Sequence, residues 1–185
     1  MNTIVTSKEA ILTCSRELVR EKGILSLNIR AVADAADISV GSVYTYYQSK
    51  ADLLCATVES IWLEIFRFPA DCSFLHDVCQ CIEWMYQCME QGEKAYPGFI
   101  AQHAIGFAGS VKADGKQRMD QIMQHVIEQL AEIIRQDPKV KADVFHDGFT
   151  PEKISDLILH VILSSTQNRN FDPSVLTELL CRAIY

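Results

Sequence analysis

Apolar residues recur every three or four positions along almost the whole 185-residue chain. This spacing places them on one side of an α-helix, and the chain lacks the alternating β-branched runs that are typical of strands. The sequence therefore predicts an all-α fold. With 49% hydrophobic and 22% charged residues, the chain has the composition of a globular protein that can bury a sizeable core.

Residues that favour helix ends divide the first fifty positions into three helices. Ser7 is a suitable N-cap for a helix that ends at Lys22, where Gly23 supplies the stop. Asn28 and Ser39 are suitable caps for two shorter helices. A turn of about three or four residues joins these two, which predicts a helix-turn-helix arrangement.

The bend in that turn falls at Asp37, since Asp tolerates the left-handed backbone conformation better than most residues. Ser49–Asp52 (SKAD) follows the pattern of a capping box with Asp in place of Glu. It predicts a connecting helix over 49–68. We therefore expect a helix-turn-helix domain over 1–50 and a larger domain over 51–185.

The sequence of the larger domain predicts five more helices. In two of them a capping residue directly precedes a proline, Thr150 before Pro151 and Asp172 before Pro173, which is typical of a helix start. The five helices are expected near Ser73–Gln91, Pro97–Phe107, Gly115–Gln136, Pro151–Thr166 and Pro173–Ala183.

Charge is distributed unevenly along the chain, whose net charge is −7. Residues 1–50 hold six Lys/Arg against five Asp/Glu, a net charge of +1. The other 135 residues hold 11 basic against 19 acidic side chains, a net charge of −8. An anionic partner is therefore expected to contact the first third of the chain.

Several classes of protein are disfavoured. No window reaches 18 uninterrupted apolar residues, so a membrane span is not expected, and the first residues lack the pattern of a signal peptide. The seven cysteines show no disulfide-framework spacing, which predicts reduced thiols in the cytoplasm. The chain has no motif that indicates a nucleophile with its base, a carboxylate pair or a phosphate loop, so we do not expect an enzyme.

The stretch SVGSVYTYYQSK, residues 39–50, holds three tyrosines within four positions, a density that indicates a contact surface. With Gly23, the segment AVADAADIS, and the pair Leu53 and Leu54, it resembles the DNA-binding domain of the TetR family of bacterial transcriptional regulators. The resemblance covers residues 7–54. Asp37 stands where the family usually has Gly, and Asn28 where it commonly has Thr.

The resemblance implies an N-terminal three-helix DNA-binding domain and a C-terminal helical domain for ligand binding and dimerisation. It also implies a one-component transcription regulator, a repressor that binds a palindromic double-stranded DNA operator as a homodimer. A small-molecule effector, largely apolar, would release it by changing the separation or tilt of the two DNA-binding heads. No cofactor is expected.

Side chains of the helix-turn-helix suit contacts with DNA. Gly41 allows close approach to a groove, while Ser and Thr hydroxyls and small apolar groups can meet base edges. The hydroxyl groups of Tyr44 and Tyr46 and the ammonium group of Lys50 suit phosphates, whereas Tyr47 occupies a position that the family buries. The residues expected to contact DNA are Asn28, Ser39, Val40, Gly41, Ser42, Tyr44, Thr45, Tyr46 and Lys50.

Aromatic residues and methionines of the larger domain predict an effector pocket, although ordinary helical cores use the same side chains. The candidates are Trp84, Met85, Phe99, His103, Phe107, Met119 and Met123.

Cysteines of the larger domain leave an alternative open, a regulator that responds to metal ions or oxidants. His76, Cys79 and Cys88 invite a metal-binding interpretation. On a helix, however, Cys79 and Cys81 point in different directions, and Cys81 and Cys88 share a face as two core residues would. We assign no metal site. A further alternative is a ligand-, metal- or redox-binding bundle whose N-terminal unit contacts proteins.

Two apolar stripes near the end of the chain predict a homodimer interface. Few later elements remain to cover them, and two such helix pairs related by a two-fold axis would form a four-helix contact. The alternative is that both helices close the core of their own subunit. The expected interface residues are Ile154, Leu157, Ile158, Val161, Ile162, Leu176, Leu179 and Leu180.

Overall fold

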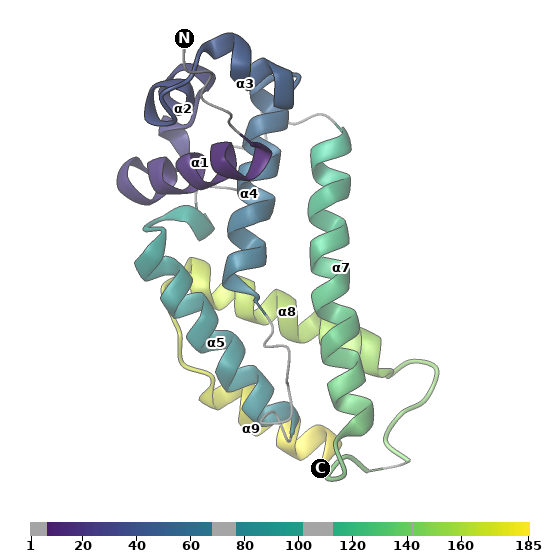
Figure 1. Cartoon of the computed structure of the whole chain (residues 1–185). Helices are drawn as coiled ribbons and strands as arrows, with labels where there is room; N and C mark the ends of the chain where they lie inside the picture. Colours follow the sequence, from purple (N-terminus) through teal and green to yellow (C-terminus); the bar gives the residue numbers. More distant parts are fainter. Residues whose placement is uncertain (1–6, 68–76, 102–112, 142) are drawn as a thin grey trace. The chain divides into compact units, whose positions relative to one another are not determined.

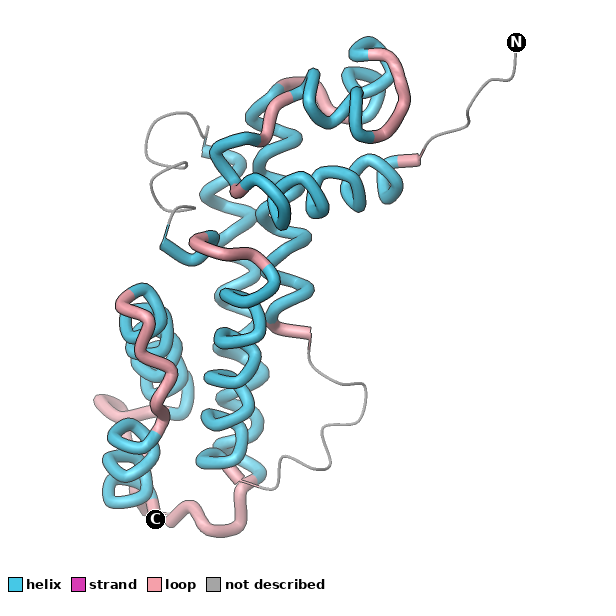
Figure 2. Tube along the Cα trace, turned by 90° about the vertical axis from the view of Figure 1, so that its left-hand side faces the viewer, coloured by secondary structure: helices cyan, strands magenta, loops and turns pink. Residues whose placement is uncertain are grey.

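The computed structural model describes residues 7–67, 77–101, 113–141 and 143–185, and every regular element in these ranges is a helix (Figure 1, Figure 2). The predicted all-α fold is confirmed. The elements are α1 (Lys8–Lys22), the 3₁₀ helix η1 (Ile24–Ser26), α2 (Ile29–Ala35), α3 (Val40–Tyr46), α4 (Lys50–Ile65), α5 (Val78–Ala95), α7 (Ala113–Gln136), α8 (Pro151–Gln167) and α9 (Ser174–Ile184).

The predicted caps start the first three α-helices. The side-chain oxygens of Ser7, Asn28 and Ser39 each accept a hydrogen bond from the backbone amide three residues later, at 3.0–3.1 Å. Gly23 ends α1 with a φ of 77°, a conformation that glycine adopts without steric cost. Short-range chemistry therefore sets the boundaries of α1, α2 and α3.

The SKAD segment also caps its helix, with one difference from a standard capping box. The Ser49 hydroxyl accepts from the Asp52 amide at 3.1 Å, as expected. The Asp52 carboxylate accepts from the amide of Gln48, one residue before the cap, also at 3.1 Å. The connecting helix α4 ends at Ile65, before the expected end at residue 68.

Helix α5 runs later in the chain than predicted, over Val78–Ala95 instead of 73–91. The carboxylate of Asp77 accepts from the Gln80 amide at 2.7 Å and so caps α5, whereas Ser73 lies outside the described residues. The helix expected over 97–107 is described only as far as residue 101, and residues 99–101 are helical.

Helix α8 begins as predicted, with the Thr150 hydroxyl accepting from the Lys153 amide at 3.3 Å. Helix α9 begins one residue later than predicted, at Ser174. The Asp172 carboxylate accepts from the Ser174 amide at 2.9 Å, so it still serves the start of that helix.

The chain divides into two compact units. Unit 1 comprises residues 1–64 and 92–120, and unit 2 comprises residues 65–91 and 121–185. This division follows the packing of residues against one another. Unit 1 therefore includes most of α4 together with the expected DNA-binding domain. The functional boundary expected at residue 50 stays a prediction.

In unit 1, α1 packs against α2 and α2 packs against α3. Ile11, Val32, Val43 and Tyr47 are fully buried between these helices. The Tyr47 hydroxyl donates to the backbone oxygen of Lys8 at 3.3 Å, and the Lys8 ammonium lies 5.5 Å from the centre of the Tyr47 ring. Tyr47 is therefore a core residue, as the family resemblance implied.

A polar cluster within unit 1 ties α1 to α4 and to the residue that follows α5. The Arg20 guanidinium donates to Glu64 at 2.9 Å and to the Tyr96 hydroxyl at 2.8 Å. The Tyr96 hydroxyl in turn donates to Glu64 at 2.9 Å. These three side chains hold the first helix of the expected DNA-binding domain against the connecting helix.

Unit 2 has its own core. Its fully buried side chains come from α5, α7, α8 and α9, and among them are Met85, Leu130, Ile158 and Ile184. Among the described residues, no helix combines the length and the hydropathy that a membrane span requires.

Candidate nucleic-acid interface

The turn between α2 and α3 depends on a left-handed residue at position 37. Asp37 has a φ of 51°. Its amide donates to the Asp34 oxygen at 3.3 Å, and the Ile38 amide donates to the Ala33 oxygen at 3.0 Å. This pair of bonds closes a helix when the residue after its cap is left-handed. The predicted bend at Asp37 is confirmed.

Helix α3 exposes most of the side chains that the sequence assigned to DNA. The exposed fractions of Val40, Tyr44 and Tyr46 are 38%, 50% and 37%. Val43, on the inner side of the same helix, is fully buried. The inward-facing residues thus anchor α3, while valine and two tyrosines face outward.

The hydroxyl groups of α3 are partly engaged in local hydrogen bonds. The oxygens of Ser39 and Ser42 lie 2.9 Å apart, and the Thr45 hydroxyl donates to the Gly41 backbone oxygen at 3.2 Å. Thr45 therefore offers a methyl group and an acceptor oxygen to a base edge, because its proton is already used. The Ser39 and Ser42 hydroxyl groups share one hydrogen bond, so one of their two protons is already used.

Gly41 has space for a side chain within its own chain. Apart from its two chain neighbours and the backbone of α3, the described residues place one atom within 4 Å of a Cβ atom on Gly41. This atom is Ser39 Oγ, at 3.6 Å. Glycine inside a helix costs about 1 kcal/mol relative to alanine. Since packing does not require this glycine, its small size suits an approach from outside.

Lys50 and Asn28 lie at the starts of α4 and α2, and both are exposed. The Asn28 side chain accepts from the Ala31 amide at 3.0 Å and donates to the Ser26 oxygen at 3.0 Å. Asn28 is therefore committed to capping α2, and a DNA contact through its side chain stays a prediction.

Exposed large hydrophobic side chains gather on two surfaces. Of the nine such residues in the described ranges, three are Val40, Tyr44 and Tyr46 of α3. Four more lie on α8 and α9. Contiguous apolar surface of this kind marks contact sites, whereas single exposed residues such as Leu25 and Leu63 need no explanation.

The second surface surrounds a groove of about 570 Å³ in unit 2. Leu157 and Val161 of α8 are 61% and 37% exposed there, and Val175 and Leu179 of α9 are 71% and 60% exposed. The groove is lined by Tyr86, Phe149, Ile154, Leu157, Val161, Ser165, Asn170, Asp172, Val175, Leu176, Leu179, Leu180 and Ala183.

The structure separates the expected interface residues into two groups. Leu157, Val161 and Leu179 are exposed. The others are buried within their own subunit, because α8 and α9 are apolar on more than one side and one of those sides packs in the core of unit 2. Ile154, Ile158, Ile162, Leu176 and Leu180 have exposed fractions of 8% or less, and their place in a dimer interface stays a prediction.

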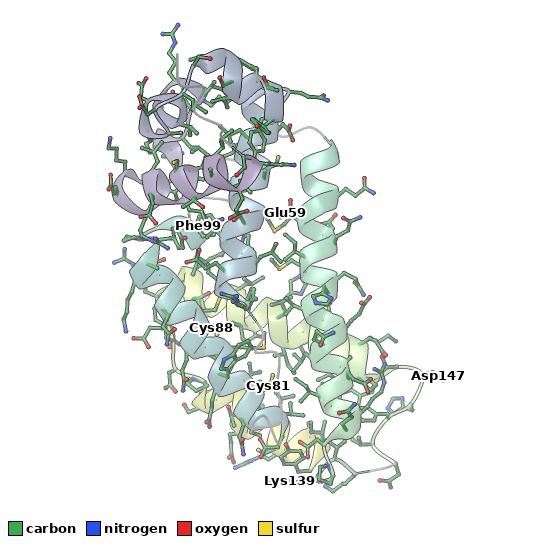
Figure 3. All side chains as sticks on the ribbon, viewed as in Figure 1. Glu59, Cys81, Cys88, Phe99, Lys139 and Asp147 are labelled. Carbon is green, nitrogen blue, oxygen red and sulfur yellow. The ribbon has the colours of Figure 1, made fainter. Side chains whose placement is uncertain are left out.

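The structure does not bring the expected effector residues together in one described cavity. Trp84, Met85 and Met123 belong to unit 2, and Phe99 and Met119 to unit 1. Met85 is fully buried. Phe99 is 1% exposed and packs 5.5 Å from Trp62, between ring centres, so it serves the core of unit 1 (Figure 3). His103 and Phe107 lie outside the described residues. An effector pocket stays a prediction.

The cysteines differ in their surroundings. Figure 3 labels Cys81 and Cys88 on α5, and Cys81 is fully buried. Burial raises the pKa of Cys88 to about 11, which disfavours the thiolate that metal ions bind. In the described part of the chain, no three His, Cys, Asp or Glu side chains are arranged to hold a metal ion. Cys181 contacts Cys79, and no local sequence signal indicates this contact.

Residues 11–57 match the family model described as "Bacterial regulatory proteins, tetR family". The chain is also 24% identical, over 132 residues, to an uncharacterized HTH-type transcriptional regulator in the lacX 3′ region of Lactococcus lactis subsp. lactis. That similarity covers 68% of this chain and 67% of the Lactococcus protein.

Solved structures share the fold. The transcriptional regulator SCO7222, a TetR from Streptomyces coelicolor, gives a TM-score of 0.63 at 18% identity, covering 90% of this chain and 72% of its own. The regulatory protein TetR from Rhodobacter sphaeroides gives a TM-score of 0.61 at 18% identity, and the match covers 96% of this chain and 98% of the Rhodobacter chain. A structure of BioQ with its natural double-stranded DNA operator gives a TM-score of 0.58 at 17% identity, and the match covers 89% of this chain and 88% of the BioQ chain.

Proposed function

We propose that this chain, which belongs to the tetR family of bacterial regulatory proteins, is a repressor that binds a palindromic operator as a homodimer. As a DNA-binding transcription regulator it is not an enzyme. We further propose that a small, largely apolar effector releases it from the operator in the cytoplasm.

One observation carries the proposal for DNA. Helix α3 turns Val40, Tyr44 and Tyr46 outward, although burying large apolar groups would stabilise the fold. The buried Val43 and the cap on Ser39 fix the helix, so the backbone positions that carry the outward side chains are set before DNA arrives. A helix that enters the major groove needs such a preset surface.

The proposed roles divide the surface of α3 into two kinds of contact. Tyr44, Tyr46 and Lys50 would bind phosphate oxygens, which fixes the register of the helix on DNA without reading its sequence. Val40 and Thr45 would read base edges, where a methyl group suits thymine and a hydroxyl group pairs with several bases. Gly41 would let the helix come close to the groove.

A second copy of the chain is the proposed occupant of the surface on α8 and α9. Exposed leucine and valine side chains border the groove there, and two copies of one self-complementary surface form a two-fold dimer. A palindromic operator has the same symmetry. A dimer would carry two recognition helices, which an operator with two half-sites requires.

Release by an effector requires a molecule that binds the free protein more tightly than the DNA-bound protein. The proposed binding residues include Met85 and the partly exposed Trp84 and Met123 of unit 2. A crystal structure of protein purified without added ligand tests this proposal. A bound molecule that contacts these three residues and lowers operator affinity would support it, whereas a molecule bound elsewhere with that effect would contradict the assignment.

The experiment that tests the DNA proposal is an electrophoretic mobility shift with DNA from upstream of the chain's own gene, followed by footprinting. We expect a protected region with two-fold symmetry whose half-sites are about one helical turn apart. A matched fragment with the same composition and a scrambled sequence serves as the control. Equal shifts for both fragments, with no protected region, would contradict specific operator binding.

A further inference from the structure

Two cysteines that are far apart in the sequence meet in unit 2. Cys79 is the second residue of α5 and Cys181 lies in the last turn of α9. They are 102 positions apart, and their Sγ atoms are separated by 2.9 Å. A disulfide bond joins sulfur atoms about 2.05 Å apart, so only a small movement would allow a bond. Both thiols are reduced and partly exposed, which leaves them open to small solutes.

Hydrogen bonds that do not involve sulfur hold the two helix ends together. One carboxylate oxygen of the buried Asp137 accepts from the Val78 amide at 2.9 Å and from the Tyr185 hydroxyl at 2.5 Å. Val78 directly precedes Cys79, and Tyr185 comes four residues after Cys181. The backbone therefore presents the two thiols to each other independently of their oxidation state.

The pair lies away from the exposed apolar face of α9. At about 100° per residue, Cys181 is roughly 200° around the helix from the exposed Leu179. The buried Leu180 lies between them on one side of the helix. A second copy that covers the exposed face would therefore leave the thiol pair uncovered.

We infer that Cys79 and Cys181 form a thiol–disulfide site that reacts with a low-molecular-weight disulfide such as glutathione disulfide. The thiolate of one cysteine attacks a sulfur atom of the small disulfide, which expels one small thiolate and leaves a mixed disulfide. The other cysteine thiolate then attacks the protein sulfur of that mixed disulfide and expels the second small thiolate. Two electrons pass from the cysteines to the small disulfide, and the two protons lost by the cysteines are taken up by the two released thiolates.

The surroundings of the pair set the speed of this exchange. Burial, and next the neighbouring Cys181, raise the pKa of Cys79 to about 12. Its thiolate is therefore scarce near neutral pH, so we expect exchange over hours. The product closes a loop across 102 positions, and such a cross-link restricts the unfolded chain. We expect the melting temperature to rise by roughly 5–10 °C.

The test uses the full-length protein and glutathione disulfide, with no DNA. After incubation, remaining thiols are blocked with an alkylating agent, and the protein is digested without reductant and analysed by mass spectrometry. We expect one linked pair of peptides, containing Cys79 and Cys181, on a protein that migrates as a single chain without reductant. Cys79→Ser and Cys181→Ser should each lose this species and the rise in melting temperature.

Cys88→Ser is the matched control, since Cys88 lies on the same helix as Cys79 and is also partly exposed. This variant should keep the linked pair and the full rise in melting temperature. Alkylation of both Cys79 and Cys181 after prolonged oxidation would overturn the inference. Stable glutathione adducts on both residues, or a link between two chains, would overturn it as well.

Discussion

The hydroxyl oxygen of Ser39 lies 3.6 Å from the point where a Cβ atom would stand on Gly41, an ordinary van der Waals distance. The fold thus has room for a Cβ atom at position 41. If α3 approaches DNA as proposed, that room is needed by the DNA and not by the protein.

Gly41→Leu should therefore separate folding from DNA binding. The free energy of unfolding should stay equal or rise by up to about 1 kcal/mol, since leucine favours a helix more than glycine does. Operator affinity should fall at least about tenfold, which corresponds to about 1.4 kcal/mol. Thermal unfolding and fluorescence anisotropy measure the two quantities. Gly41→Ala, a smaller change, should show the same gain in stability and a smaller loss of affinity. If Gly41→Leu unfolds, Gly41 is required for packing within the protein.

Thr45→Ala should change base preference with little effect on general DNA affinity. The substitution removes the acceptor oxygen and the methyl group that α3 presents to base edges, while the proposed phosphate contacts remain. Competition among operator variants should show discrimination reduced by about 1–3 kcal/mol at one base pair of each half-site. Thr13→Ala is a matched control, because the Thr13 hydroxyl donates to the Glu9 backbone oxygen at 3.0 Å, as Thr45 does to Gly41. An unchanged preference in Thr45→Ala would exclude a base contact at this position.

Replacing Leu157 and Leu179 together by Glu should yield a folded monomer. Both side chains are about 60% exposed in one subunit, so charge there opposes self-association without disturbing the core. Leu176 is unsuitable for this test because it is 8% exposed and its replacement would disturb the subunit itself. Light scattering at micromolar concentration measures the mass, and circular dichroism checks helix content. Leu63→Glu, at a leucine that is 54% exposed in α4, should remain a dimer. Monomeric wild-type protein would refute the interface.

Tyr47→Phe should weaken the dependence of stability on alkaline pH. Burial, followed by nearby carboxylates, raises the pKa of Tyr47 from 10.0 to about 12, so the folded state favours the neutral phenol. This contribution is fully present below pH 10 and is lost as the pH rises through about 12. Denaturant unfolding across that range should show a smaller loss for the variant than for wild type. At neutral pH the variant should lose about 1 kcal/mol with the hydrogen bond to Lys8. Tyr44→Phe, on the surface, should lose stability at alkaline pH as wild type does. If Tyr47→Phe loses the same stability as wild type over this pH range, the loss does not come from Tyr47.

The start of the chain was predictable because its signals act over short distances. The caps at Ser7, Asn28 and Ser39 bond to amides three residues away, and the bend at Asp37 depends on the backbone of α2 alone. Such bonds form within a segment whatever surrounds it. The sequence therefore predicted α1, α2 and α3 almost to the residue.

Features that depend on packing could not be predicted in this way. Ile158 and Leu157 are equally apolar neighbours on α8, yet Ile158 is fully buried and Leu157 is 61% exposed. Only the packing of unit 2 decides which of them faces outward. The contact between Cys79 and Cys181 spans 102 positions, and no short-range pattern connects two such residues.

The salt dependence of operator binding tests the central claim most directly. Each phosphate neutralised by a lysine releases a counterion, and a dimer that neutralises one phosphate through Lys50 of each subunit should lose roughly tenfold in affinity between about 50 and 200 mM salt. Lys50→Ala should weaken binding to all sequences equally and reduce the slope of log affinity against log salt by about two. Lys153→Ala, at an exposed lysine in the first turn of α8, should leave affinity and slope unchanged. Operator affinity that does not respond to salt, or a slope that is the same in Lys50→Ala and wild type, would contradict the proposed mode of DNA binding.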